Sequence, residues 1–403
     1  MNEKLFTIAL GITEPVYIED IRFDKAAGEL HIYLDFRRGG RFECPECGAP
    51  APAADTIEKT WRHMNFFQYK CFLHMHTPRV NCPEHGAHLW TPPRTRSKSG
   101  FTLLFEALVM QLAQAMPVSQ IAELVGEHDT RIWRIIKNYV AKAYVGKDLA
   151  GLERVGVDET SSSKGHRYVT VFADVDSGEA VFVTPGKGAE TIASFVGELP
   201  NHGAKPEEIK EITMDMSPSF ISGATEQLPN ASITFDKFHV VKLLNEALDA
   251  VRREEQKVNP LLKKTRYIWL KNPQNLTVAQ IQSLGSLRKE NLKTARAYQM
   301  KLTFQDIYRE IKDPITADIA IKKWLSWAVR SRLDPIRKFA QTVKKHYDGI
   351  LRYFSSGLTS GFMEGINSRI QEVKRRARGF RNINNYISMI YLVAGGLDLE
   401  LPI

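Results

Sequence analysis

The stretch "GVDETSSSKGHRY", residues 156–168, decides the fold of this 403-residue chain. An apolar, β-branched approach leads into two adjacent carboxylates, Asp158 and Glu159, and a polar turn and a second strand-like run follow. The chain as a whole carries surplus positive charge. A buried strand that ends in acids therefore indicates that their partner is a metal cation rather than a basic side chain.

The segments around this stretch predict a mixed α/β sheet. Three hairpin-connected strands come first, and a helix and two further strands follow in alternation. The expected strands lie near 153–157, 167–174, 180–184, 209–214 and 231–235, and the expected helix near 189–199.

Two further acids fall where such a sheet would bring them to Asp158. Asp215 follows buried strand residues in "EITMDMSPSF" (211–220) and precedes a Ser-Pro turn into a helix. Glu364, in "SGFMEGINSRIQEVKRR" (360–376), lies away from its helix's apolar stripe, on a polar face with Asn367, Ser368 and Gln371. Three such carboxylates suit two hard divalent cations, Mg²⁺ or Mn²⁺, in phosphoryl chemistry. The predicted catalytic residues and magnesium ligands are Asp158, Asp215 and Glu364.

Three neighbouring residues leave alternatives open. Strand alternation sends Glu159 to the opposite face from Asp158, where it would support the site or pair with Lys164 or Arg167. Asp236, in "FDKFH", also ends a strand and competes with Asp215 as a ligand. Asp236 and His239 either line the site or serve as a helix N-cap and a buried polar histidine.

Two matching knuckles predict a structural zinc site. "CPECG" (44–48) and "CPEHG" (82–86) share their flanking residues, and the glycine permits the tight turn that points two ligands at one ion. His88 is the alternative to His85, and Cys71 is expected in the core. The predicted Zn²⁺ ligands are Cys44, Cys47, Cys82 and His85.

Residues 117–140 predict a helix-turn-helix that contacts DNA. Ser119 and Asp129 are expected to cap two helices, and Gly126 to end the first. Ile132, Ile135, Ile136, Tyr139 and Val140 form the buried stripe of the second helix. The opposite face would meet the DNA, and its residues are Thr130, Arg131, Arg134, Lys137 and Asn138. The alternative is a helical hairpin with a solvated basic face.

The charge balance favours a polyanionic partner. Lys and Arg number 55 against 46 Asp and Glu, for a net charge of +9. A basic linker is expected at 92–100, and a second basic run would hold DNA phosphates through Lys374, Arg375, Arg376, Arg378 and Arg381. The sequence contains no run of 18 apolar residues, so it predicts no membrane span. The N-terminal residues lack signal-peptide features, so a cytoplasmic protein is expected.

In combination, these motifs resemble the DDE transposases of bacterial insertion sequences, of the ISL-three type. The residues that carry the resemblance are "CPECG…CPEHG", "VGVDETSSSKGHRYVTVFADVDSG", "MDMSPSF", "ITFDKFHVVKLLNEALDAVRR" and "FMEGINSRIQEVKRRARGFRN". The resemblance implies an N-terminal zinc ribbon, a helix-turn-helix and an RNase H-like catalytic domain with a helical insertion. It implies Mg²⁺-dependent cleavage and joining of double-stranded DNA at terminal inverted repeats and a target, beside the bacterial nucleoid. Asp158, Asp215 and Glu364 match the family's catalytic triad.

The expected architecture is a multidomain α+β protein. Its parts are a β/zinc ribbon domain at 1–92, a helix-turn-helix domain at 93–150, an RNase H-like domain at 151–240 and 355–403, and a helical insertion at 241–354. Synapsis of two element ends implies a homodimer assembled on DNA, and the insertion would carry that interface, contact DNA, or both. Two rival functions are a DNA-binding regulator with an inactive RNase H-like domain, and a nuclease or resolvase without joining activity.

Overall fold

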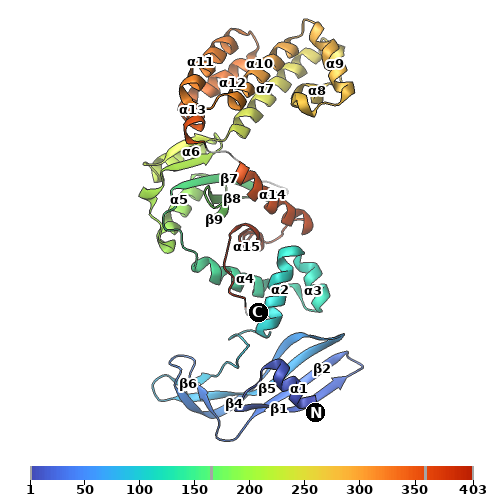
Figure 1. Ribbon diagram of the computed structural model, residues 1–403, viewed down its shortest axis with the longest axis vertical. Coiled ribbons are helices and arrows are strands. Elements are labelled where there is room, and N and C mark those ends of the chain that lie inside the picture. The colour runs from blue at the N-terminus through green and yellow to red at the C-terminus, as the bar shows by residue number, and fades with distance from the viewer. Residues whose placement is uncertain (1, 164–166, 358–360, 402–403) are drawn as a thin grey trace. The chain divides into compact units, whose positions relative to one another are not determined.

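The computed structural model describes residues 2–163, 167–357 and 361–401. The chain divides into two compact units, Met1–Ala143 with Asp398–Ile403, and Tyr144–Leu397 (Figure 1). In the described part of the chain, no helix combines the length and the apolar character needed to span a bilayer. The division into four domains stays a prediction.

The first unit is built on a twisted sheet with the strand order β1-β2-β5-β4-β3, and β6 pairs with β5. Its elements are α1 (Asn2–Leu10), β1 (Val16–Asp24), β2 (Glu29–Phe36), β3 (Arg41–Glu43), β4 (Pro50–Phe66), β5 (Tyr69–Cys82) and β6 (Gly86–Leu89). The alternating apolar residues of β2 and β5, among them Leu30, Ile32 and Leu73, form the core of this unit. Residues 67 and 68 make the turn between β4 and β5, where Phe67 has a φ of 52°.

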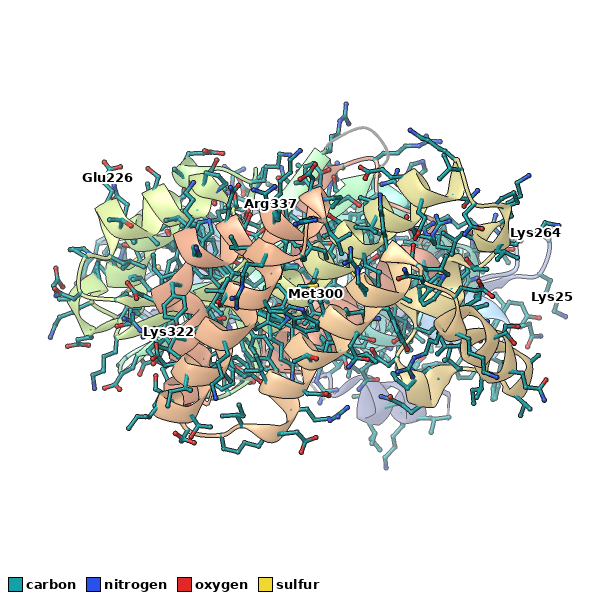
Figure 2. The ribbon with its side chains drawn as sticks, turned by 90° about the horizontal axis from the view of Figure 1, so that it is seen from above. Lys25, Glu226, Lys264, Met300, Lys322 and Arg337 are labelled. Atoms are coloured by element: carbon teal, nitrogen blue, oxygen red, sulfur yellow. The ribbon has the colours of Figure 1, made fainter. Side chains whose placement is uncertain are left out.

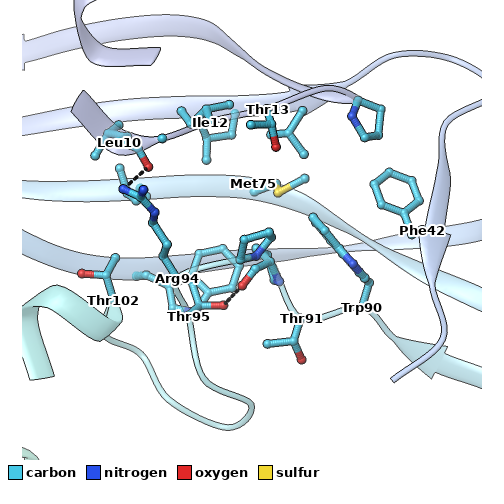
Figure 3. Close-up of a pocket in the computed structure, with 18 of the residues that line it drawn as sticks. Leu10, Ile12, Thr13, Phe42, Met75, Trp90, Thr91, Arg94, Thr95 and Thr102 are labelled. Atoms are coloured by element: carbon cyan, nitrogen blue, oxygen red, sulfur yellow. Dashed lines mark hydrogen bonds between the residues drawn. The ribbon is translucent and has the colours of Figure 1, made fainter. Parts of the chain in front are cut away.

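The predicted basic linker is packed onto this unit. A cavity of about 500 Å³ lies between the end of α1, the sheet and the segment after β6, and Met75 and Trp90 line it (Figure 3). Across the cavity mouth, Arg94 donates a hydrogen bond of 3.1 Å to the carbonyl of Leu10. Arg96 donates to both carboxylate oxygens of Glu106, a fully buried side chain, at 2.8 and 3.1 Å. These two arginines are therefore internal contacts of the fold.

Three helices follow in the order that a helix-turn-helix requires: α2 (Leu103–Ala115), α3 (Val118–Val125) and α4 (Asp129–Val145). Gly126 ends α3 with a φ of 67°, as expected. The two predicted N-caps are wrong. Helix α3 begins before Ser119, which lies inside its first turn, and His128 rather than Asp129 accepts the backbone N–H of Thr130, at 3.3 Å.

A buried arginine holds the turn of this motif to the sheet. Arg62 of β4 is 1% exposed, and its Nε lies 3.7 Å from a carboxylate oxygen of Glu127. The same guanidinium donates to the carbonyl of Val125 at 3.2 Å, and Lys70 Nζ donates to the carbonyl of Gly126 at 3.2 Å. The last carbonyls of α3 are thus satisfied by side chains of the sheet.

The second unit contains the predicted mixed sheet, with the strand order β11-β10-β7-β8-β9. Its strands are β7 (Arg154–Ser163), β8 (Arg167–Asp174), β9 (Glu179–Pro185), β10 (Glu211–Met214) and β11 (Ser232–Phe235). Strands β7, β8 and β9 pair antiparallel, whereas β10 pairs parallel with both β7 and β11. This is the RNase H-like arrangement expected from the sequence.

Helices cover both faces of this sheet (Figure 1). They are α5 (Ala189–Glu198) and α6 (Pro218–Gln227) on one face, and α14 (Gly361–Arg376) and α15 (Ile383–Ala394) on the other. Phe172 of β8 stacks on Phe195 of α5 at 4.4 Å between ring centroids. On the opposite face, Tyr391 of α15 accepts the backbone N–H of Val183 at 2.9 Å. Short 3-10 turns lie at Leu199–His202, Pro206–Glu208, Pro260–Leu262 and Pro273–Asn275.

A helical insertion separates β11 from α14. It comprises α7 (Lys237–Gln256), α8 (Arg266–Leu270), α9 (Val278–Lys289), α10 (Lys293–Glu310), α11 (Pro314–Arg330), α12 (Asp334–Lys345) and α13 (Tyr347–Ser356). Phe304 packs on Trp324 and Phe339, with ring centroids 4.7 and 5.5 Å away. Met300 lies among these helices, while Lys322 and Arg337 project outward (Figure 2). The insertion therefore has an aromatic core continuous with that of the sheet.

Replacing Arg62 with methionine should destabilise the first unit by about 3 kcal/mol, because the buried carboxylate of Glu127 loses a buried partner. Urea unfolding of the full chain, with hydrogen exchange at residues 118–126, measures the change. The matched control is Arg79→Met, which removes an exposed ion pair with Asp55 and should cost under about 1 kcal/mol. Equal losses in the two variants would contradict a special role for Arg62.

Candidate functional site

Parallel strand register brings three aspartates to one level of the sheet. Thr213 of β10 is paired with Gly156 of β7, and Met214 with Phe235 of β11. Asp215 and Asp158 each come two residues after the first pair, and Asp215 and Asp236 each come one residue after the second. Asp158 does not end its strand, as the sequence suggested, because β7 continues to Ser163 against β8. It marks instead the point where β10 ends and β7 loses its parallel neighbour.

These aspartates line a small pocket. Its walls also include His239 from α7 and Met363 from α14; the complete lining is Val157, Asp158, Thr213, Met214, Asp215, Asp236, His239 and Met363. The structure thus brings Asp158 and Asp215 together, as predicted, and adds Asp236. Glu364 does not line this pocket; it is exposed in the first turn of α14, immediately after Met363.

Helix α14 runs along β7 and bonds to it through one polar stripe. Asn367 Nδ2 donates to Asp158 Oδ2 at 2.6 Å, and Gln371 Nε2 to Thr160 Oγ1 at 2.8 Å. One turn further on, Lys374 Nζ donates to Ser161 Oγ at 2.8 Å. The sequence placed Asn367 and Gln371 on the polar face but gave them no role. Their spacing with Lys374, i, i+4, i+7, was the signal for a helix face that meets the strand.

A glycine permits this close approach. A Cβ atom on Gly156 would lie 2.4 Å from Cζ of Phe362 and 3.1 Å from Sδ of Met363. A Cβ at this position of β7 would require the side chains of Phe362 and Met363 to move. The absence of a side chain at residue 156 therefore lets these two residues of α14 pack directly on the strand.

Burial and like charge shape the ionisation of the acids. Burial raises the pKa of Asp158, and the charge of Asp236 adds to this, while the Glu159 N–H, Asn367 and His239 act in the opposite direction. The pKa of Glu159 is also raised, by burial and by Asp215. Lys187, in the loop after β9, lowers the pKa of Glu159 in opposition to these effects, as does His239, and the sequence analysis gave Lys187 no role. Lys164, a predicted partner of Glu159, lies outside the described residues.

Asp236 and His239 combine the two roles that the sequence left open. Asp236 is the N-cap of α7, accepting the N–H of Phe238 at 2.9 Å, and it also lines the pocket. His239 Nδ1 is buried and has no hydrogen-bond partner among the described residues. A buried imidazole nitrogen of this kind is available to a ligand that enters the pocket.

The four predicted zinc ligands converge. Their ligand atoms, from Cys44, Cys47, Cys82 and His85, all lie within 4.8 Å of one another. The Sγ atoms of Cys47 and Cys82 are 3.7 Å apart, and Cys82 Sγ lies 3.6 Å from His85 Nδ1. Two sulfurs bound tetrahedrally to one zinc ion lie about 3.8 Å apart. The set therefore fits a closed, structural Zn²⁺ site.

The residues around the cluster agree with this assignment. The knuckles connect β3 to β4 and β5 to β6, and the pairing of β4 with β5 brings the two knuckles together. His88 donates from Nε2 to the carbonyl of His85 at 2.7 Å and so supports the knuckle from outside the cluster. Cys71 is buried in the sheet core, as predicted. Among described residues, this is the one cluster of metal-ligand type whose atoms already converge.

The predicted buried stripe of α4 is confirmed in full, since Ile132, Ile135, Ile136, Tyr139 and Val140 are all buried. The outward face of α4 contains both residues that bond within the fold and residues that are exposed. Arg131 pairs with Glu127 and stacks over Phe101, 4.3 Å from the ring centroid. Asn138 accepts a hydrogen bond of 3.2 Å from Arg96. Thr130 and Arg134 are exposed, and Lys137 is partly exposed.

A basic cleft of about 910 Å³ lies at the end of α14, next to β7. Lys374, Arg375, Arg378 and Arg381 line it, and Arg167 of β8 joins them. The fifth predicted residue, Arg376, lies outside the lining and pairs with Glu372 at 3.8 Å. A strand of DNA in this cleft would meet several cations close to the acidic pocket.

A Cys₃His β unit, a helix-turn-helix and an acid-bearing mixed sheet together define a multidomain protein that acts on DNA. Models of three protein families match the chain in this order. A zinc finger of the transposases IS204/IS1001/IS1096/IS1165 matches residues 40–85, the helix-turn-helix domain of transposase family ISL3 matches 93–140, and the ISL3 transposase domain matches 155–390. The chain belongs to the ISL3 family of transposases.

Curated relatives agree over the full length. The transposase for insertion sequence element IS1557 of Mycobacterium tuberculosis, in the strains CDC 1551 / Oshkosh and H37Rv, is 30% identical, and the match covers 100% of this chain and 97% of the relative. The transposase for IS1001 of Bordetella parapertussis is 27% identical, over 84% of this chain and 85% of the relative.

The zinc site predicts a specific loss of metal. Wild-type protein should contain one equivalent of zinc, and Cys47→Ser should lose it, because three ligands hold the ion far less tightly than four. Metal analysis by mass spectrometry measures the content. Cys71→Ala, which removes a buried thiol outside the cluster, should keep the full equivalent. Zinc retained by Cys47→Ser would dismiss the site.

Proposed function

We propose that this transposase binds the terminal inverted repeats of an insertion sequence and catalyses metal-dependent strand cleavage and strand transfer. Asp158, Asp215 and Glu364 would hold a pair of Mg²⁺ or Mn²⁺ ions. The observation that carries the proposal is the meeting of Asp158 and Asp215 at the level where β10 ends, with α14 bonded directly to Asp158.

The side chains fit hard divalent cations. Three of the eight residues that line the pocket are aspartates, and carboxylate oxygens are the ligands that Mg²⁺ requires. Bound ions would supply an activated hydroxyl nucleophile and stabilise the leaving oxygen of the phosphodiester. Asn367 fixes the orientation of the Asp158 carboxylate, and Ser217 does the same for Asp215 by donating its backbone N–H at 2.9 Å. Both acids are thus held in place before substrate enters.

Glu364 is the proposed third ligand, and its position supports this role. It follows Met363, which lines the pocket, and it precedes Asn367 by one turn of α14. A three-residue offset places two helical side chains about 60° apart around the axis, on neighbouring parts of one flank. We infer that the flexible, exposed Glu364 side chain turns toward Asp158 when cations enter. Asp236 would support the site from the side of α7.

The DNA contacts are proposed on two surfaces. Thr130, Arg134 and Lys137 on α4 would read the inverted repeat, while Arg131 and Asn138, already bonded within the fold, would keep the helix in place. Lys374, Arg375, Arg378 and Arg381 would hold the phosphates of the cleaved strand and the target, and Arg376 would add charge nearby. Joining two ends requires two active sites, so a homodimer formed on DNA is proposed, at the nucleoid of a bacterial cell.

Asp158→Asn should bind element-end DNA with unchanged affinity and lose cleavage and strand transfer on the order of 10³-fold, because several kcal/mol of metal-dependent stabilisation disappear. A gel assay with labelled end DNA, with and without Mg²⁺, measures both products. Asp176→Asn, which alters an exposed hairpin acid paired with Arg154, is the matched control and should stay active. Full activity of Asp158→Asn would defeat the mechanism. Cleavage by wild type without joining would identify a nuclease or resolvase.

Two variants distinguish Glu364, the proposed third metal ligand, from its rival Asp236. Glu364→Gln should lose cleavage as severely as Asp158→Asn, whereas Asp236→Asn should lose about 10- to 100-fold, as outer supports of metal sites do. The same assay, with DNA binding as the check on folding, compares the two. A near-normal Glu364→Gln together with a dead Asp236→Asn would transfer the ligand role to Asp236.

A further inference from the structure

A groove on the helical insertion has no role in the chemistry described so far. It measures about 800 Å³ and lies between α7, α8 and the segment after α8. Three apolar residues contribute to it, and the remainder is charged or carries an amide. Its lining, called here the α7 groove, is Phe238, Val241, Lys242, Asn245, Glu246, Asp249, Arg252, Arg253, Arg266, Leu270, Lys271, Asn272, Asn275 and Gln305.

Positive charge is concentrated in this groove beyond what its acids neutralise. Three guanidinium groups converge on Asp249, with Nε of Arg252, Arg253 and Arg266 at 2.8, 3.5 and 3.5 Å from its carboxylate oxygens. One carboxylate balances one of these three charges. Lys242 and Lys271 add further charge to the lining, against Glu246 alone. Asp249 holds Arg252 in position through the hydrogen bond, while Arg253 and Arg266 lie at longer range with exposed side chains that can reach a ligand.

The uncharged polar residues suit the same kind of ligand. Asn245, Asn272, Asn275 and Gln305 present amides to the groove, and amides bond readily to phosphate and sugar oxygens. A protein–protein interface of stable type would instead place apolar, uncharged residues at its centre. The lining therefore favours a polyanion over a second protein.

Helix α7 connects the groove to the acidic pocket. The helix starts at the Asp236 cap, its third residue His239 lines the pocket, and Phe238 and Lys242 already line the groove. From His239 to Asp249 the helix rises about 15 Å. Over that length a DNA strand presents about four phosphates. The groove thus begins where the pocket ends and extends for several nucleotides.

We propose that the α7 groove binds the phosphate backbone of the DNA that continues past the scissile phosphate. This proposal rests on the function proposed above, since it takes the acidic pocket as the place of strand cleavage. It gives the helical insertion a role of its own, which is to hold the flank of the cleavage position against the catalytic sheet.

The test removes charge from the groove and, in a matched control, from elsewhere on the insertion. Lys242→Gln/Arg253→Gln removes two exposed cations from α7. Lys322→Gln/Arg337→Gln removes two exposed cations from α11 and α12, neither of which lines the groove. Affinity for element-end duplex is measured against salt concentration, without Mg²⁺, so that no cleavage occurs. One duplex stops at the scissile phosphate and the other extends ten base pairs beyond it.

The groove variant should weaken binding of the extended duplex by at least tenfold and lower its log–log salt slope by about 2, since each phosphate contact contributes about 0.9. Its affinity for the short duplex should equal that of wild type, and the control variant should match wild type on both. Equal losses in the two variants, or equal losses on the two duplexes, would overturn the proposal. So would unchanged DNA binding with altered self-association, which would make the groove a contact between copies.

Failure of this proposal is distinguishable from failure of the proposed function. A wild-type protein that never cleaves end DNA in Mg²⁺ would refute the function, whereas the groove is judged by metal-free binding alone. Circular dichroism of both double variants confirms that each remains folded before its affinity is compared.

Discussion

The contact between α14 and β7 is the constraint on which the proposed active site depends. Gly156 leaves room for Phe362 and Met363, and the stripe of Asn367, Gln371 and Lys374 then bonds along the strand. Parallel pairing fixes Asp158 relative to Asp215, because β10 and β7 share a hydrogen-bonded register. The third acid comes from a helix more than a hundred residues later, so only side-chain packing relates it to the other two. The chain between Asp215 and Glu364 is too long for connectivity to fix the position of Glu364 relative to the two aspartates.

Much of this arrangement could be predicted from the sequence, and the reasons are physical. The strands of the second unit have strong period-two or continuous apolar patterns, and the stripe of α4 has a clean helical period. The paired knuckles are equally direct, because zinc ligands must occur at short, fixed spacings. In each case the information is local, so a few residues specify the result.

The errors have a common cause in tertiary context. Asp158 seemed to end a strand because polar residues follow it, yet pairing with β8 extends β7 to Ser163. Arg131 and Asn138 were expected to face DNA, and the sequence did not reveal that they also bond to Glu127 and Arg96. Glu127 lies in the turn before α4, and Arg96 lies in the segment predicted to be a linker. In neither place does a periodic pattern indicate the direction of a side chain. The course of α14 beside Asp158 also required the structure, since Asn367 rather than Glu364 makes the contact.

The anchoring of the helix-turn-helix has a consequence for how such a protein could be retargeted. Glu127 is shared by Arg62 inside the sheet unit and Arg131 on the outward face of α4. An altered residue 131 would disturb the scaffold together with the surface, so this position is poorly suited to redesign. Under the proposed function, engineering toward a new recognition sequence would start from residues 130, 134 and 137, of which Thr130 also bonds to its neighbour His128 at 3.0 Å. Few residues of α4 can therefore be changed to alter sequence recognition, because the other residues of its outward face bond within the fold.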